Sequence, residues 1–165
     1  MKAWFKTLLV GGGVLAAAPV AAQDLPLSVE VRLDAGIPVQ DTDDFLDRGV
    51  GFGARALLEL APTFSIYAGY SRFEFQGDND LVGGGDVEED GFELGGRLSM
   101  GHGHGRSQPY ILLGALFHGD ETGLEAGIGA DYGVSWNLSV TPEVRYRTID
   151  DVDYLTLGIG LRIRP

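Results

Sequence analysis

The sequence predicts an all-β protein, an eight-stranded antiparallel up-and-down transmembrane β-barrel that is preceded by a cleavable signal peptide. Three observations lead to this fold class. Runs of about ten residues alternate between apolar and polar side chains, which is the period of a β-strand. No stretch after residue 22 is apolar for long enough to form a membrane helix, so a membrane crossing requires strands. The charges on the polar phase nearly cancel, as buried charges must.

The first 22 residues have the layout of a secretory signal peptide. Lys2 and Lys6 give a positive start, residues 7–18 form a short apolar run, and small residues precede Gln23. We therefore expect residues 1–22 to be a signal peptide and residues 23–165 to form one outer-membrane β-barrel domain.

The charge and the cysteine content restrict the chemistry and the partners. The chain has 24 acidic and 12 basic residues, and the part after residue 22 has a net charge of −14 because both lysines precede it. This acidic balance argues against nucleic acid as a partner. The absence of cysteine excludes disulfide bonds and thiolate chemistry.

Eight alternating runs are expected to be strands. In Leu27–Asp34, aliphatic side chains occupy the odd positions and polar ones the even positions. The other runs are residues 49–60, 64–75, 91–100, 110–117, 124–134, 138–148 and 154–163. The connections expected after odd-numbered strands are 38–48, 76–90, 118–123 and 149–153, and those after even-numbered strands are 61–63, 101–108 and 135–137. The first set is longer in total, which fits external loops opposite periplasmic turns.

Three places leave the strand pattern open. The phase blurs at residues 72–75, where we expect a bulge or the end of the membrane zone. The run 110–117 is apolar on both phases, and we favour Ile111, Leu113, Ala115 and Phe117 outward because this places Gly114 with the other inward glycines. Pro142 conflicts with a closed barrel, so a bulge or a ladder that starts only after it is expected.

The polar phase is predicted to fill the barrel interior with a network of paired charges. Glycines on the same phase would make room for arginine side chains, which pair well with carboxylates. A soluble lipocalin-like barrel would have the opposite arrangement, with an apolar interior. The expected lumen network is Glu30, Arg32, Asp34, Arg55, Glu59, Glu93, Arg97, Glu125, Asp131, Glu143, Arg145, Arg147 and Arg162.

Aromatic residues on the apolar phase fall near the ends of the runs. Two such belts are expected at the two membrane interfaces. The belt toward the external loops would contain Phe52, Tyr70, Phe92, Phe117 and Tyr146, and the belt toward the turns would contain Phe64 and Tyr132.

Three segments resemble the small outer-membrane barrels typified by the OmpA transmembrane domain and the opacity-type porins. They are the turn and strand Ala61–Tyr70, the strand Glu143–Tyr146 and the closing Gly158–Ile163. The resemblance implies a place in the bacterial outer membrane, with lipid and lipopolysaccharide as surroundings and the barrel-assembly machinery as a partner during biogenesis. It does not indicate one function.

Three classes of function remain open at this stage. The leading prediction is a non-enzymatic envelope barrel with a structural or surface-interaction role and no cofactor. The alternatives are a small porin-like channel, which a filled lumen would make narrow, and a lipid-modifying enzyme. His118 lies near Asp120 and Glu121, but no serine is clearly aimed at it, so we predict an interfacial polar residue.

No metal site is predicted. His102 and His104 make at best half a zinc site. Asp41, Asp43 and Asp44 offer oxygen ligands for divalent cations, but their spacing completes no known loop, and Asp78–Asp80 lacks the glycine of an EF-hand. A weak sharing of divalent cations with lipopolysaccharide is the expectation for these acidic loops.

Overall fold

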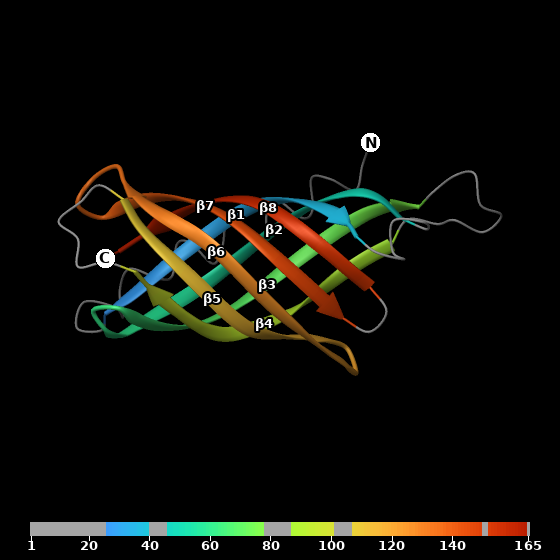
Figure 1. Ribbon diagram of the computed structural model, residues 1–165, viewed down its shortest axis with the longest axis horizontal. Coiled ribbons are helices and arrows are strands. Elements are labelled where there is room, and N and C mark those ends of the chain that lie inside the picture. The colour runs from blue at the N-terminus through green and yellow to red at the C-terminus, as the bar shows by residue number, and fades with distance from the viewer. Residues whose placement is uncertain (1–25, 40–45, 78–86, 101–106, 150–151, 165) are drawn as a thin grey trace, which may run out of the picture.

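The computed structural model describes residues 26–39, 46–77, 87–100, 107–149 and 152–164. Eight strands form one closed antiparallel barrel in which neighbours in sequence are neighbours in space (Figure 1). The strands are β1 Leu27–Pro38, β2 Leu46–Ala61, β3 Phe64–Gly77, β4 Val87–Ser99, β5 Ser107–His118, β6 Glu121–Gly133, β7 Leu138–Ile149 and β8 Val152–Ile163. The described part of the chain contains no helix that is long and apolar enough to cross a membrane.

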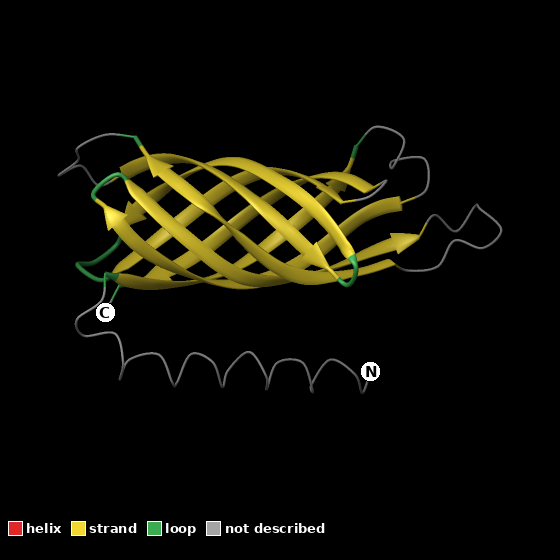
Figure 2. Ribbon diagram, turned by 90° about the horizontal axis from the view of Figure 1, so that it is seen from below, coloured by secondary structure: helices red, strands yellow, loops and turns green. Residues whose placement is uncertain are grey.

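The first and last strands close the barrel. β1 pairs with β8 over ten residue pairs, from Val29 opposite Ile163 to Pro38 opposite Tyr154. Figure 2 shows the strands crossing obliquely on the near and far sides, as the tilt of a closed barrel requires. We call the end that carries residues 62–63 and 134–137 the turn end, and the opposite end, which carries residues 119–120, the loop end.

Two of the predicted loops are wrong. β5 and β6 are joined by Gly119 and Asp120 alone, and His118 pairs with Glu121. Gly119 has φ of 55°, which suits the first central position of a two-residue hairpin turn. The predicted loop 149–153 is also mostly strand, because Ile149 pairs with Val152. The alternation of apolar and polar side chains, from which the strands were predicted, ends before the backbone ladders do.

The predicted bulge at residues 72–75 is absent, and β3 keeps its register with β2 there. Register shifts lie instead between Leu46 and Gly49 and between Glu59 and Ala61. What changes is the chemistry of the two faces. Phe73 and Phe75 point inward and are buried, whereas the alternate positions on β3 point outward and carry charge. This apolar interior with a polar exterior is what a strand in water needs, so it fits the predicted end of the membrane zone.

The facing of β5 is as predicted. Ile111, Leu113 and Phe117 are exposed on the outside and Ala115 is half-buried. Tyr110, Leu112 and Leu116 of the opposite phase are buried inside. Pro142 needs no bulge. It pairs with Ile159 of β8 in continuous register, while the ladder with β6 skips residues 141 and 142 and resumes without a shift.

Candidate functional site: the charged lumen

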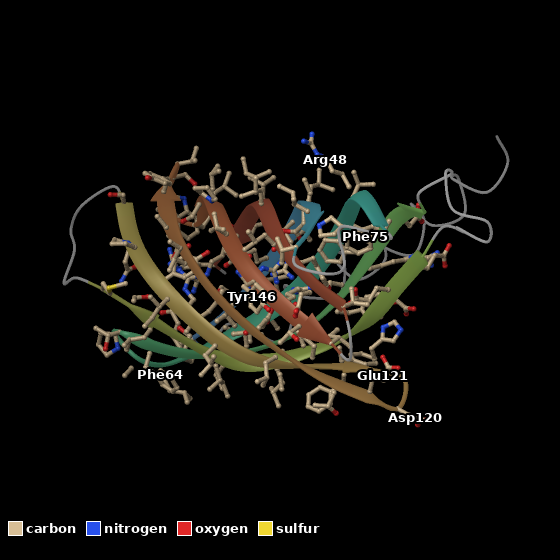
Figure 3. All side chains as sticks on the ribbon, turned by 45° about the vertical axis from the view of Figure 1, so that its right-hand side comes forward. Arg48, Phe64, Phe75, Asp120, Glu121 and Tyr146 are labelled. Carbon is tan, nitrogen blue, oxygen red and sulfur yellow. The ribbon has the colours of Figure 1, made fainter. Side chains whose placement is uncertain are left out.

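The predicted lumen charges lie on the inward phase of the strands, and Figure 3 shows side-chain nitrogen and oxygen atoms inside the barrel. Glu59, at the turn end, is half-buried, and the other predicted network residues are buried. Those buried residues are Glu30, Arg32, Asp34, Arg55, Glu93, Arg97, Glu125, Asp131, Glu143, Arg145, Arg147 and Arg162. They separate into two clusters.

The central cluster is built around Arg145, whose side chain is fully buried. Its guanidinium forms ion pairs with Asp34 at 3.1 Å, Glu125 at 3.1 Å, Glu143 at 2.9 Å and Glu93 at 3.4 Å. The members of the cluster are Arg32, Arg55, Arg145, Arg147, Glu30, Asp34, Glu93, Glu125 and Glu143. Four arginines thus face five carboxylates.

Two carboxylates of the central cluster, Glu93 and Glu143, each bridge several strands. Glu93 of β4 accepts from Arg32 of β1 at 2.8 Å and from Arg147 of β7 at 2.5 Å. Glu143 of β7 pairs with Arg55 of β2 at 2.6 Å. Arginine suits this role because its planar fork donates to more than one carboxylate. The network therefore cross-links the barrel through its interior.

The turn-end cluster consists of Arg97, Arg162, Arg164, Glu59 and Asp131. Asp131 pairs with Arg97, with Arg162 at 2.8 Å and with Arg164 at 3.5 Å. Glu59 pairs with Arg162 at 2.7 Å and with Arg164 at 3.4 Å. Three arginines face two carboxylates, so this cluster has an excess of positive charge. Arg164 was not predicted, because it follows the last alternating run.

Buried aromatic and aliphatic side chains form an apolar cluster that contacts both charged clusters. It consists of Leu57, Tyr67, Tyr110 and Leu112, all buried. The Tyr110 hydroxyl donates to Glu143 of the central cluster at 2.7 Å, and the Arg97 guanidinium lies 3.4 Å from the centre of the Tyr110 ring. Within the described ranges no ion pair joins the two clusters.

The glycines of the inward phase make room for more than arginine. Gly127 borders Arg145, as predicted. Gly95 and Gly114, however, both lie against the Tyr67 hydroxyl, and Gly51 lies against the Phe73 ring. The expectation that inward glycines make room for arginines is therefore wrong at Gly51 and Gly95, because inward aromatic side chains need the same space.

An aromatic cluster, which we call the loop-end cap, lies on the loop-end side of the central cluster. It consists of Phe73, Phe75 and Tyr154, with ring centroids 5.2 to 6.0 Å apart. The Tyr154 hydroxyl donates to Glu89 at 2.8 Å, and the Arg147 guanidinium lies 5.2 Å from the centre of the Phe73 ring. Continuing the inward phase of residues 65–71 by four positions would have predicted both phenylalanines.

The predicted interface aromatics lie on the outside of the barrel. Phe52, Phe64, Tyr70, Phe92, Phe117 and Tyr132 are exposed, and Tyr146 is half-buried. Tyr70 and Phe92 form an edge-to-face pair with centroids 5.5 Å apart. Trp136, at the turn between β6 and β7, is 85% exposed and was not predicted as an interface residue.

Those candidate residues for chemistry that the structure describes do not form an active site. His118 borders a cavity of about 10 Å³ together with Ser71 and Glu89, which is space for about one water molecule. The Ser71 hydroxyl accepts a hydrogen bond from Arg147 at 3.0 Å. Among the described residues, no group of three or more histidine, aspartate or glutamate side chains could hold a metal ion. The acidic candidates Asp41, Asp43, Asp44 and Asp78–Asp80, and the histidines His102 and His104, lie outside the described residues.

A closed eight-stranded barrel with an apolar exterior and a charged, paired interior defines a membrane-spanning β-barrel. The family described as outer membrane protein beta-barrel domain matches residues 7–164. The chain belongs to this family, and its place is the outer membrane. No curated protein matches the sequence.

Solved structures of small outer-membrane barrels share the fold. Neisserial surface protein A is 13% identical, with a TM-score of 0.64 over 85% of this chain and 97% of that one. The N-terminal barrel of Pseudomonas aeruginosa OprF is 14% identical, with a TM-score of 0.54 over 82% and 97%. The attachment invasion locus protein Ail of Yersinia pestis is 15% identical, with a TM-score of 0.54 over 84% and 96%.

Proposed function

We propose that this protein is a non-enzymatic barrel whose lumen is closed to ions and which serves the envelope as a structural and surface-interaction element. The observation that carries the proposal is the filling of the lumen. Two charged clusters, the apolar cluster that contacts both, and the loop-end cap fill the interior. A path for hydrated ions would have to break several buried ion pairs, which costs several kcal/mol per stranded charge.

The surroundings of the barrel follow from its two ends and its outer face. We propose that residues 1–22 are removed as a signal peptide, that the exposed aromatics form the two interface belts, and that lipid and lipopolysaccharide cover the outside. The barrel-assembly machinery would insert the chain. Divalent cations would connect the acidic loops to lipopolysaccharide phosphates, because an acidic chain repels these anions directly.

The sulfated sugar in one Ail structure illustrates a different surface chemistry. Ail was solved in complex with a heparin analogue, sucrose octasulfate. With 24 acidic and 12 basic residues, this chain would repel such a polyanion unless cations intervene. The proposed surface role is therefore contact with cationic or cation-bridged partners.

Single-channel recording in planar lipid bilayers tests the closed lumen. The folded protein should produce no sustained current, whereas a general porin inserted under the same conditions provides the positive control. A steady conductance that scales with the number of inserted barrels would instead support the porin-like alternative. Insertion should be verified independently by protease protection of the reconstituted barrel.

A further inference from the structure

A polar cavity of about 220 Å³, which we call the turn-end vestibule, lies inside the turn end of the barrel. It is lined by Glu59, Ala61, Pro62, Ser65, Ser99, Gln108, Arg162 and Arg164. A water molecule occupies about 30 Å³ in the liquid, so the vestibule has room for a small hydrated ion. Its wall offers two arginines, two serine hydroxyls and one amide against a single carboxylate.

The positive charge beneath the vestibule is incompletely neutralised. Arg97, Arg162 and Arg164 converge on the same carboxylate oxygen, Oδ2 of Asp131. Arg97 is buried, and its Nε and Nη1 atoms have no hydrogen-bond partner in the described part of the protein. A buried guanidinium with two donor atoms that lack partners is costly, and an additional anion nearby would lower that cost.

Glu59 is the second carboxylate of the turn-end cluster, and one of its oxygen atoms forms ion pairs with two arginines. Its Oε1 lies 2.7 Å from Arg162 and 3.4 Å from Arg164. Arg164 is more than one-third exposed and both of its ion pairs are at least 3.4 Å long, so its guanidinium is loosely held. This arginine can turn toward a ligand without leaving a buried charge behind.

We propose that the turn-end vestibule binds a small oxyanion of the phosphate class, held by the guanidinium groups of Arg162 and Arg164 and by the hydroxyl and amide groups of its wall. Arginine forks donate paired hydrogen bonds to phosphate oxygens, and charge-assisted bonds of this kind are the strong ones. The buried Arg97 adds long-range attraction. The result is a cationic site in a chain whose net charge is −12.

Two sources could supply this chemistry: free phosphate, or a phosphorylated small molecule, in the fluid at the turn end, and the headgroup of a phospholipid. The vestibule is lined by strand ends of β2, β3, β4, β5 and β8 that face the barrel interior. A headgroup would have to bend over the barrel rim to reach it. The free anion is the favoured source, and the experiment separates the two.

Calorimetric titration of inorganic phosphate into the barrel, folded in a detergent without phosphate, tests the proposal. Saturable binding is expected for the unmodified chain. Arg164→Gln should weaken it by about tenfold, or about 1.4 kcal/mol, because one charge-assisted contact is lost. Glu59→Gln should strengthen it, because the competing carboxylate is lost. The two changes should act in opposite directions, and a remote arginine variant separates a local site from general attraction to arginine.

Arg72→Gln is the matched control. Arg72 points outward near the loop end and pairs with Glu88 at 2.6 Å, so its loss should leave phosphate affinity unchanged. Each variant should first be shown to be folded by its mobility in unheated detergent gels. Absence of saturable binding, or equal affinities in all four proteins, would overturn the proposal.

A second titration in lipid nanodiscs decides between the two sources. Affinity for free phosphate that is equal in phosphatidylcholine and phosphatidylglycerol discs supports the free anion. An affinity reduced by phosphatidylglycerol, and restored in detergent, supports a phosphodiester headgroup as the natural occupant of the same site.

Discussion

Arg145 shows what a single residue contributes to this barrel. Its fully buried side chain lies within 3.4 Å of four carboxylates from four different strands. Replacing a whole buried network by apolar residues is often neutral, but removing one partner leaves the remaining charges incompletely compensated. The cost of such a change therefore comes mainly from the carboxylates that remain.

Arg145→Ala should lower the free energy of unfolding by about 3–5 kcal/mol, as breaking a buried pair does. Arg48→Ala is the control, because Arg48 is exposed near the start of β2 and a surface charge contributes only ~0–1 kcal/mol. Denaturant titration of both variants in the same lipid measures the difference. Equal small losses would mean that the inward face behaves as hydrated surface.

The alternation of inward and outward positions along each strand predicted which residues carry the lumen charge, but not which residues pair. Arg145 and Asp34 are 111 positions apart and meet across the barrel. Such partners depend on strand tilt and stagger, which no local pattern encodes. The same limit explains why the two clusters and the unpaired atoms of Arg97 could not be predicted. The same alternation could, however, have predicted that the aromatic residues Tyr110 and Tyr154 point inward.

Strand β3 shows why element ends were harder to predict than element centres. Its alternation is regular from Phe64 to Phe75, but the polarity of its faces inverts after Ser71. A pattern that assumes apolar outward residues reads this inversion as a break. The inversion fits a strand that leaves lipid for water at this point, because the solvent would change while the backbone geometry continues.

Within β8, the cost of an outward arginine should depend on depth. Leu157 is at the middle of the strand and 50% exposed, and Ile163 is at its turn end and 43% exposed. Leu157→Arg should cost about 2–4 kcal/mol, and Ile163→Arg about 0–1 kcal/mol. Ile128→Arg in β6 provides a second mid-strand site. The free energies of unfolding are measured by reversible unfolding in vesicles. A cost below about 1 kcal/mol at both mid-strand sites would place these outward faces away from lipid.

At the scale of the whole molecule, the number of strands and their up-and-down order were predictable, because each strand corresponds to a separate run of alternating apolar and polar residues in the sequence. Closure was a consequence of chemistry, since a lipid-exposed sheet edge would leave backbone groups without partners. The ladder between β1 and β8 provides that closure. The interior pairs then join strands that are not neighbours, as between β4 and β1. Unfolding must therefore break the ladder and the lumen network together.

This coupling predicts resistance to detergent at room temperature. The folded chain should keep its barrel in sodium dodecyl sulfate, migrate anomalously on a gel, and shift to its full mobility only after boiling, because the closed ladder offers no edge at which opening can begin. A chain that ends at Ile149 lacks β8 and is the control; with β1 and β7 left as edges, it should show one band whether heated or not. Circular dichroism of the unheated samples establishes which of them are folded. A full-length sample with β-sheet signal and identical mobility before and after boiling would contradict the closed, cross-linked barrel.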